Sequence, residues 1–168
     1  MKTLLLAAAV LSTSSLSLAA APEKSLCHAD ETVLFQCTIK SKQAVLCASG
    51  ASKGDAGKLQ YRYGTEKKIE LSYPDTPQPA AGTFFRSETA YSGGGEERIR
   101  FKSGDYDYFL FQRTVRTGFG NGPNNPEFSG GIVTRHGNDV TKRLCTRDDP
   151  IKAGTQDLPE EEFESLDN

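Results

Sequence analysis

Apolar and polar residues alternate with a period of two along much of the chain after residue 31, a pattern that predicts β-strands. Candidate strands at 59–63 and 69–73 flank a turn at Gly64, and those at 128–134 and 139–145 flank the turn His136-Gly137-Asn138. No long segment has the 3.6-residue period of an amphipathic helix. We therefore expect an all-β fold, either an antiparallel β-sandwich or a closed β-barrel, of about eight strands.

The clearest pair of strands lies between Arg98 and Val115. Apolar Ile99 and Phe101 alternate with basic residues in the first arm, and Phe109 and Phe111 alternate with their neighbours in the second. Pairing Phe101 with Phe109 and Ile99 with Phe111 would place both pairs on one buried face. This register predicts a β-hairpin whose loop runs over about five residues, 103–107.

The predicted loop carries the sequence Ser103-Gly104-Asp105-Tyr106. The chain has four Ser-Gly pairs, at Ser49, Ser92, Ser103 and Ser129, and only the pair at Ser103 is followed two places later by Tyr. Gly104 suits a tight turn because glycine adopts a positive φ without steric cost. Ser, Gly and Asp are common in turns, so these residue types alone do not indicate a functional site. The position of the motif at a hairpin tip is the stronger indication.

A Ser-Gly-x-Tyr motif at a hairpin tip, in a small exported all-β protein with few cysteines, resembles the periplasmic inhibitors of invertebrate-type lysozyme. The resemblance covers the strand order from about Thr32 to Cys145 and leaves the acidic tail outside. It implies that the tip enters the lysozyme active-site cleft, with Ser103 and Tyr106 in contact with the catalytic region and Gly104 as the turn glycine. It also implies a homodimer, and lysozyme, most of all of the invertebrate type, as partner.

An alternative from another class is a non-enzymatic module that binds a glycan or an envelope protein, in which the tip is only a turn. Clustering of Tyr61, Tyr63 and Tyr73 on one sheet face would favour that alternative. A hydrolase is the third option, but His28 and His136 have no nearby Ser or Cys arranged as nucleophile and base. We expect no enzymatic activity, no cofactor and no metal.

The first 21 residues have the pattern of a secretory signal peptide. Met1-Lys2 precedes an apolar run from Leu4 to Leu11, and small residues follow at 19–21. The apolar run is much shorter than the roughly 20 residues that a membrane span requires. We therefore expect a cleaved signal over 1–21, an inhibitor domain over 22–145, no membrane anchor and a periplasmic location.

Charge divides the chain into two parts. Residues 22–145 contain 17 basic and 14 acidic residues, whereas residues 146–168 contain 2 basic and 8 acidic residues. The net charge of the whole chain is −2, and basic residues form no cluster interleaved with aromatics, which argues against nucleic acid as a partner. The segment 146–168 is expected to be a mobile acidic tail.

Four cysteines in an exported chain predict two disulfides. A turn centred on Lys42 would place Cys37 directly across from Cys47 on neighbouring strands. This register predicts the pairs Cys37–Cys47 and Cys27–Cys145. A zinc site is disfavoured, because the compartment oxidises thiols and the spacings differ from those of zinc ligands.

Overall fold

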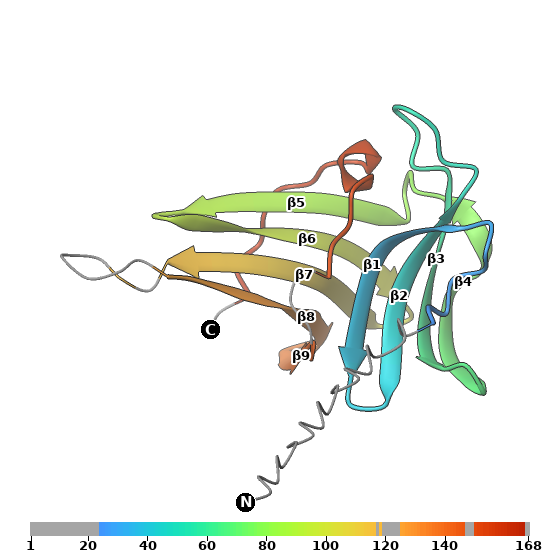
Figure 1. The fold of residues 1–168 in the computed structure, drawn as a ribbon, viewed down its shortest axis with the longest axis horizontal. Helices are drawn as coiled ribbons and strands as arrows, with labels where there is room; N and C mark the ends of the chain where they lie inside the picture. The colour runs from blue at the N-terminus through green and yellow to red at the C-terminus, as the bar shows by residue number, and fades with distance from the viewer. Residues whose placement is uncertain (1–23, 117, 119–124, 147–149, 167–168) are drawn as a thin grey trace, which may run out of the picture.

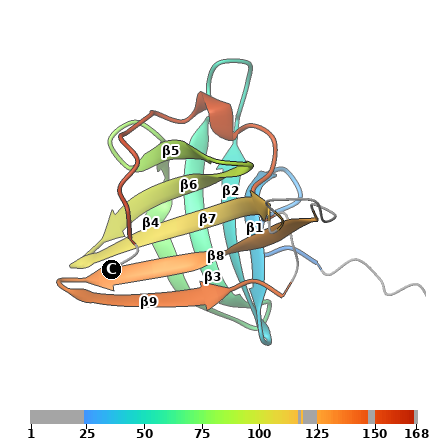
Figure 2. The same cartoon turned by 90° about the vertical axis from the view of Figure 1, so that its left-hand side faces the viewer.

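The computed structural model describes residues 24–116, 118, 125–146 and 150–166, and these form two antiparallel sheets (Figure 1). One sheet has the order β1-β2-β3-β4 and the other β5-β6-β7-β8-β9. The strands of the two sheets cross one another where they face (Figures 1 and 2). In chain order the elements are β1 (Thr32–Ile39), β2 (Lys42–Ser49), β3 (Lys58–Thr65), β4 (Lys68–Pro79), β5 (Phe84–Tyr91), β6 (Gly94–Ser103), β7 (Tyr106–Arg116), β8 (Pro126–His136), β9 (Asp139–Leu144) and the short 3₁₀ helix η1 (Thr155–Asp157).

The sandwich expected from the alternating pattern is confirmed, and a closed barrel is not formed. Within the described residues there are nine strands, close to the eight expected. The predicted turns also hold: β3 pairs with β4 around the turn after Gly64, and β8 pairs with β9 around Gly137-Asn138. In the described part of the chain, no helix has the length and apolar character needed to cross a membrane. The predicted signal peptide, 1–21, lies outside the described residues.

The core between the sheets is rich in aromatic rings. Phe101 on β6 is fully buried, and its ring stacks on Tyr108 at a centroid distance of 4.8 Å and on Tyr73 at 5.2 Å. Tyr61 and Phe84 pack against the same ring at 4.8 Å and 5.4 Å. Aromatic pairs at these distances add to the stabilisation from apolar burial, so Phe101 joins the two sheets.

The hairpin from Arg98 to Val115 forms, but its predicted register is wrong by one residue. Phe101 pairs with Tyr108 rather than Phe109, and Ile99 pairs with Leu110 rather than Phe111. The turn contains two residues instead of five, and a shift of one residue moves every side chain of a strand to the other face. The alternating pattern could not choose, because β7 is apolar on both faces.

Phe109 and Phe111 therefore lie on the outer face of the five-stranded sheet. They form a small cluster with Val133 of β8, and Leu166 near the end of the chain packs against it. Two cationic side chains lie over these rings. The Arg135 guanidinium lies 5.3 Å from the Phe109 ring centroid, and the Lys142 ammonium lies 4.7 Å from the Phe111 ring centroid. The cluster around Phe109 and Phe111 is thus covered, whereas Val140 and Leu144 on β9 stay exposed on the same face.

The disulfides join Cys27 to Cys47 and Cys37 to Cys145, so both predicted pairs are wrong. The β1–β2 turn is tighter than expected, with Ile39 paired to Lys42, and Cys37 consequently lies opposite Ala44. Cys37 belongs to the main core between the sheets, whereas Cys47 belongs to a separate cluster with Leu26. One disulfide therefore links β1 to the end of β9 across the sandwich, and the other fastens the N-terminal segment to β2.

Residues 150–166, expected to be mobile, are instead packed against both sheets. Ile151 and Leu158 are 7% and 3% exposed and belong to the main core. The backbone of the tail first pairs with the edge of β1, where Lys152 N donates to Leu34 O at 2.8 Å. It then crosses to the edge of β5, where Glu161 N donates to Arg86 O at 2.8 Å. Figure 2 shows this segment passing over β5 and β6.

Candidate functional site

The β6–β7 turn presents the residues that the sequence marked as an inhibitory loop. Ser103 ends β6, Tyr106 begins β7, and Gly104 and Asp105 form the two-residue connection. Gly104 has φ +58° and Asp105 has no positive φ, which is the pattern of a type II′ turn with glycine in the first central position. Nothing lies within 4 Å of the position of a Cβ at Gly104, so backbone conformation alone requires glycine here.

Ser103 and Tyr106 lie directly opposite each other at the end of the hairpin. Opposite residues in an antiparallel pair project from the same face of the sheet, so the two side chains are neighbours. Tyr106 is 45% exposed and Ser103 is half-buried. Neither hydroxyl has a hydrogen-bond partner among the described residues. The tip therefore offers two adjacent hydroxyls to an outside molecule.

The tip rests against the neighbouring β8–β9 hairpin, whose turn lies beside it (Figure 2). The Tyr106 ring stacks on the imidazole of His136 at a centroid distance of 4.5 Å and an interplanar angle of 18°. Its centroid also lies 6.4 Å from that of Tyr108, whose ring stacks on Phe101 in the core. Tyr106 is thus held in place by two neighbouring rings, which reduces the entropy lost when it binds a partner.

His136 is a member of this site that sequence reasoning placed only in a turn. His136 reaches the tip because it is paired with Tyr106 across the β7–β8 ladder. The sequence does contain a signal, since Tyr106 follows one tight turn and His136 precedes another. Without the strand order, however, nothing in the sequence indicates that these two turns adjoin.

The two acidic residues near the tip differ in their surroundings. Asp107 is fixed by Arg135 at 3.2 Å and lies 3.8 Å from Arg100. Asp105 is exposed and forms no ion pair within the described part of the chain. The charge at the very tip is therefore a single unneutralised carboxylate, flanked by uncharged hydroxyls.

The tyrosines considered as a glycan platform share the inner face of the four-stranded sheet. Tyr61 is 1% exposed, and Tyr73 stacks on Phe101 within the core. Tyr63 is half-buried at the edge of the same cluster. These three rings contribute mainly to the packing between the sheets, and among large aromatic residues of the described chain Tyr106 and Phe128 are the exposed ones.

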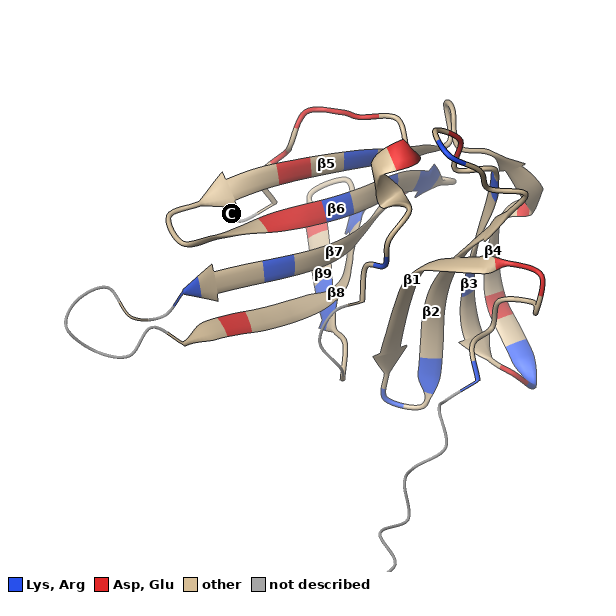
Figure 3. Cartoon of the chain, turned by 45° about the horizontal axis from the view of Figure 1, so that its top comes forward, with Lys and Arg blue, Asp and Glu red and all other residues tan. Residues whose placement is uncertain are grey.

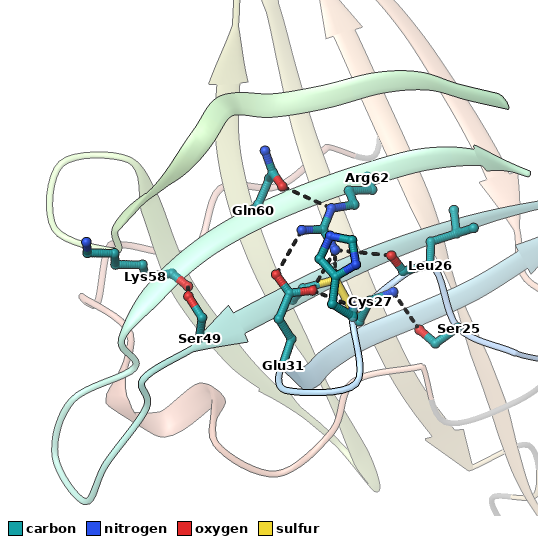
Figure 4. The surroundings of a disulfide bond; sticks show 10 residues. Ser25, Leu26, Cys27, Glu31, Ser49, Lys58, Gln60 and Arg62 are labelled. Atoms are coloured by element: carbon teal, nitrogen blue, oxygen red, sulfur yellow. Dashed lines mark hydrogen bonds and ion pairs between the residues drawn. A yellow bond between two sulfur atoms is a disulfide. The ribbon is translucent and has the colours of Figure 1, made fainter. Parts of the chain in front are cut away.

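A second cluster of charged groups surrounds the Cys27–Cys47 disulfide (Figure 4). The Arg62 guanidinium donates to both oxygens of Glu31, at 2.6 and 2.8 Å, and to the Leu26 carbonyl at 3.1 Å. Burial by itself would raise the pKa of Glu31, but the hydrogen bonds and charge of Arg62, together with the hydrogen bond that His28 N donates at 2.7 Å, hold that pKa below its usual value of 4.5. The pair therefore stays ionised and fastens the N-terminal segment to β3.

Sulfur and carboxylate atoms of Cys27, Cys47 and Glu31 lie within 4.8 Å of one another, a spacing compatible with metal ligands. The two sulfurs are joined in the disulfide and so are not available as thiolates. Glu31 is already engaged by Arg62. The cluster is accounted for by its role in holding the N-terminal segment.

In comparisons with known proteins, no family model, no curated protein and no solved structure matches this chain.

Proposed function

We propose that the protein is a periplasmic lysozyme inhibitor that blocks peptidoglycan hydrolysis by placing the β6–β7 tip in the active-site cleft. The observation that supports this most is the pair of unpartnered hydroxyls, Ser103 and Tyr106, side by side at an exposed and well-supported tip. The resemblance of the Ser-Gly-x-Tyr motif to inhibitors of invertebrate-type lysozyme provides the target. The inhibitor acts by occlusion and performs no chemistry of its own.

Hydroxyls suit a lysozyme cleft because that cleft holds one protonated and one ionised carboxyl group. A hydroxyl donates to a carboxylate or accepts from a carboxylic acid, and it brings no charge that must be desolvated. Ser103 and Tyr106 take the places of substrate hydroxyls, and the Tyr106 ring fills a sugar position. Asp105, which has no cationic partner in the described chain, would be repelled by the catalytic carboxylates, so this arrangement requires it to point to a cationic part of the cleft rim.

Export to the periplasm is part of the proposal. The two disulfides fit an oxidising compartment, and the sequence begins with the signal pattern described above. A homodimer, implied by the resemblance alone, remains a prediction. Light scattering at micromolar concentration measures it, and a monomer mass would leave the inhibitor proposal intact.

The direct test is a turbidity assay on bacterial cell walls with chicken-type, goose-type and invertebrate-type lysozymes in parallel. Wild-type protein should inhibit the invertebrate type most strongly. Tyr106→Ala should lose about 2 kcal/mol or more of binding, as expected of a buried aromatic anchor. Ser103→Ala should lose about 1.5–3 kcal/mol if its partner is ionised, and Tyr106→Phe should separate the hydroxyl from the ring.

The chain supplies a matched control at the opposite end of β6. Ser92 and Gly93 form the two-residue β5–β6 turn, another Ser-Gly pair at a hairpin tip, and Ser92→Ala should inhibit as well as wild type. All variants should keep their melting temperature within roughly a few degrees, because exposed tips contribute little to stability. Full inhibition by a Ser103→Ala, Tyr106→Ala double variant would remove the tip from the mechanism.

A further inference from the structure

A cavity of about 380 Å³ lies between the two sheets, behind the β6–β7 tip. Its polar walls come from both sheets, with Lys42, Tyr61 and Tyr63 on one side and Tyr106, Tyr108 and Arg143 on the other. Thr134 of β8 and aliphatic side chains of β1, β4 and β8 complete the lining. We call this space the tyrosine cavity. Its volume falls in the range of about 300–1,000 Å³ that is usual for small-molecule sites.

Among the residues that line the cavity, Tyr61 has a hydroxyl of particular interest. This residue is only 1% exposed, yet its hydroxyl has no hydrogen-bond partner among the described residues. The hydroxyl oxygen is not sealed from water, since the buried side-chain polar atoms without a partner in the described chain belong to Gln43 and Arg113. The Tyr61 ring packs in the core against Phe101, whereas the residue also lines the cavity, where its unpaired hydroxyl is available to a molecule that enters.

Arg143 gives the cavity its charge. It is exposed on β9 and forms no ion pair within the described chain, whereas Lys42, on the opposite wall, is paired with Glu70 at 2.6 Å. The cavity therefore carries one positive charge that the protein does not neutralise. Burial, followed by the neighbouring tyrosines, raises the pKa of Tyr61, although Arg143 opposes the shift, so this hydroxyl remains a hydrogen-bond donor at neutral pH.

We propose that the tyrosine cavity binds a small acidic sugar, a pyranose ring carrying one carboxylate, with the carboxylate at Arg143 and the ring hydroxyls against the tyrosine hydroxyls. A single guanidinium matches a single carboxylate. Tyrosine rings present apolar faces to the C–H face of a sugar and polar edges to its hydroxyls. An aromatic acid of similar size would fit the charge but would leave the Tyr61 hydroxyl unpaired, and a neutral sugar would leave Arg143 unmatched.

Isothermal titration calorimetry on the full mature chain tests this with D-glucuronate, D-glucose and benzoate as probes. Glucuronate should bind saturably, and both glucose and benzoate should bind about tenfold more weakly or worse. Arg143→Gln should weaken glucuronate binding by about tenfold or more, and Tyr61→Phe, which keeps the ring, by about fivefold, in line with the loss of a charged and a neutral hydrogen bond. Lys142→Gln is the matched control, because Lys142 neighbours Arg143 on β9 but covers Phe111 on the other face.

Three results would overturn the proposal: no saturable binding of glucuronate, equal binding of glucose, or tighter binding of benzoate. A loss of affinity in Lys142→Gln as large as in Arg143→Gln would also overturn it, since the effect would then reflect general charge. Both Arg143→Gln and Tyr61→Phe should retain the wild-type melting temperature, which circular dichroism checks. No lysozyme is present in these titrations, so their outcome is independent of the inhibitor proposal.

Discussion

Opposite ends of the chain pack on parts of the two outer faces of the sandwich, and the two ends are held in different ways. On the four-stranded sheet, a short N-terminal segment is fixed by the Cys27–Cys47 disulfide and by the Arg62–Glu31 ion pair, whose side chains are 7% and 6% exposed. On the five-stranded sheet, the longer C-terminal tail is held by ion pairs that remain partly open to water.

Figure 3 shows the second arrangement as alternating basic and acidic bands on β5 and β6 beside the acidic tail. Arg100 and Glu161, for example, form a hydrogen-bonded pair with side chains 25% and 21% exposed, and Arg98 lies 4.1 Å from the Phe163 ring centroid. The short N-terminal segment depends on a few strong contacts, whereas the longer C-terminal tail can rely on many weak ones. The two faces should therefore respond differently to single substitutions.

The largest effect should come from deleting residues 150–168. This removes three buried apolar residues, Pro150, Ile151 and Leu158, each worth about 1.5–3 kcal/mol, and uncovers the cluster around Phe109. We expect a loss of about 5 kcal/mol or more, enough to unfold a typical domain, measured by urea denaturation followed by circular dichroism.

A shorter deletion, of residues 162–168, keeps these three residues and the Arg100–Glu161 pair while removing Phe163 and Leu166. It should cost much less than the longer deletion. If the deletion of residues 150–168 left the unfolding midpoint unchanged, the tail would not belong to the core.

On the other face, a single substitution should have nearly as large an effect. Glu31→Gln leaves the buried Arg62 guanidinium without its charge partner, which typically costs about 3–5 kcal/mol at neutral pH. Because the folded pKa of Glu31 lies below 4.5, the stabilisation is complete above that pH and is lost as the pH falls through the folded pKa.

Unfolding of wild type and Glu31→Gln should therefore be compared between pH 3 and pH 7. The difference in unfolding free energy should be largest at neutral pH and should shrink under acid. Glu66→Gln, at an exposed turn glutamate, is the control and should track wild type throughout. A difference that is independent of pH would mean that the charge of Glu31 is not what stabilises this segment.

The smallest effect should come from one ion pair of the tail. Glu161→Gln breaks the pair with Arg100, and partly exposed pairs of this kind are worth about 0.2–1 kcal/mol at low salt. Salt should reduce the effect further, because the charges are accessible to ions. Glu162→Gln, an exposed neighbour with no partner in the described chain, should be neutral, and thermal unfolding at two salt concentrations compares them.

The sequence predicted the fold class and most strand positions because alternation with short turns is a strong signal. It failed where a strand is apolar on both faces. In β7, Tyr108 and Leu110 face the core while Phe109 and Phe111 face the tail, so alternation permits two registers. In β2, Leu46 faces the core and Cys47 the N-terminal segment, and the disulfide prediction failed for the same reason.

The candidate site was predictable in its residues but not in its surroundings. A Ser-Gly-x-Tyr motif between two strands indicates a tip, and the tip exists. The contact of Tyr106 with His136 and the cavity with Arg143 depend on strand order and sheet packing, which join segments far apart in the chain. Similarly, acidic composition indicated a mobile tail, because composition does not reveal that Arg98, Arg100 and Arg135 line one face.

The path of the tail also decides which strand edges of the sandwich are paired. An edge strand exposes unpaired N–H and C=O groups to which another strand can add. The tail pairs with β1 and then with β5, so that one segment closes one edge of each sheet. Because the tail follows all nine described strands along the chain, both edges stay open until the tail has docked, and a chain with an undocked tail exposes two strands to which others can add.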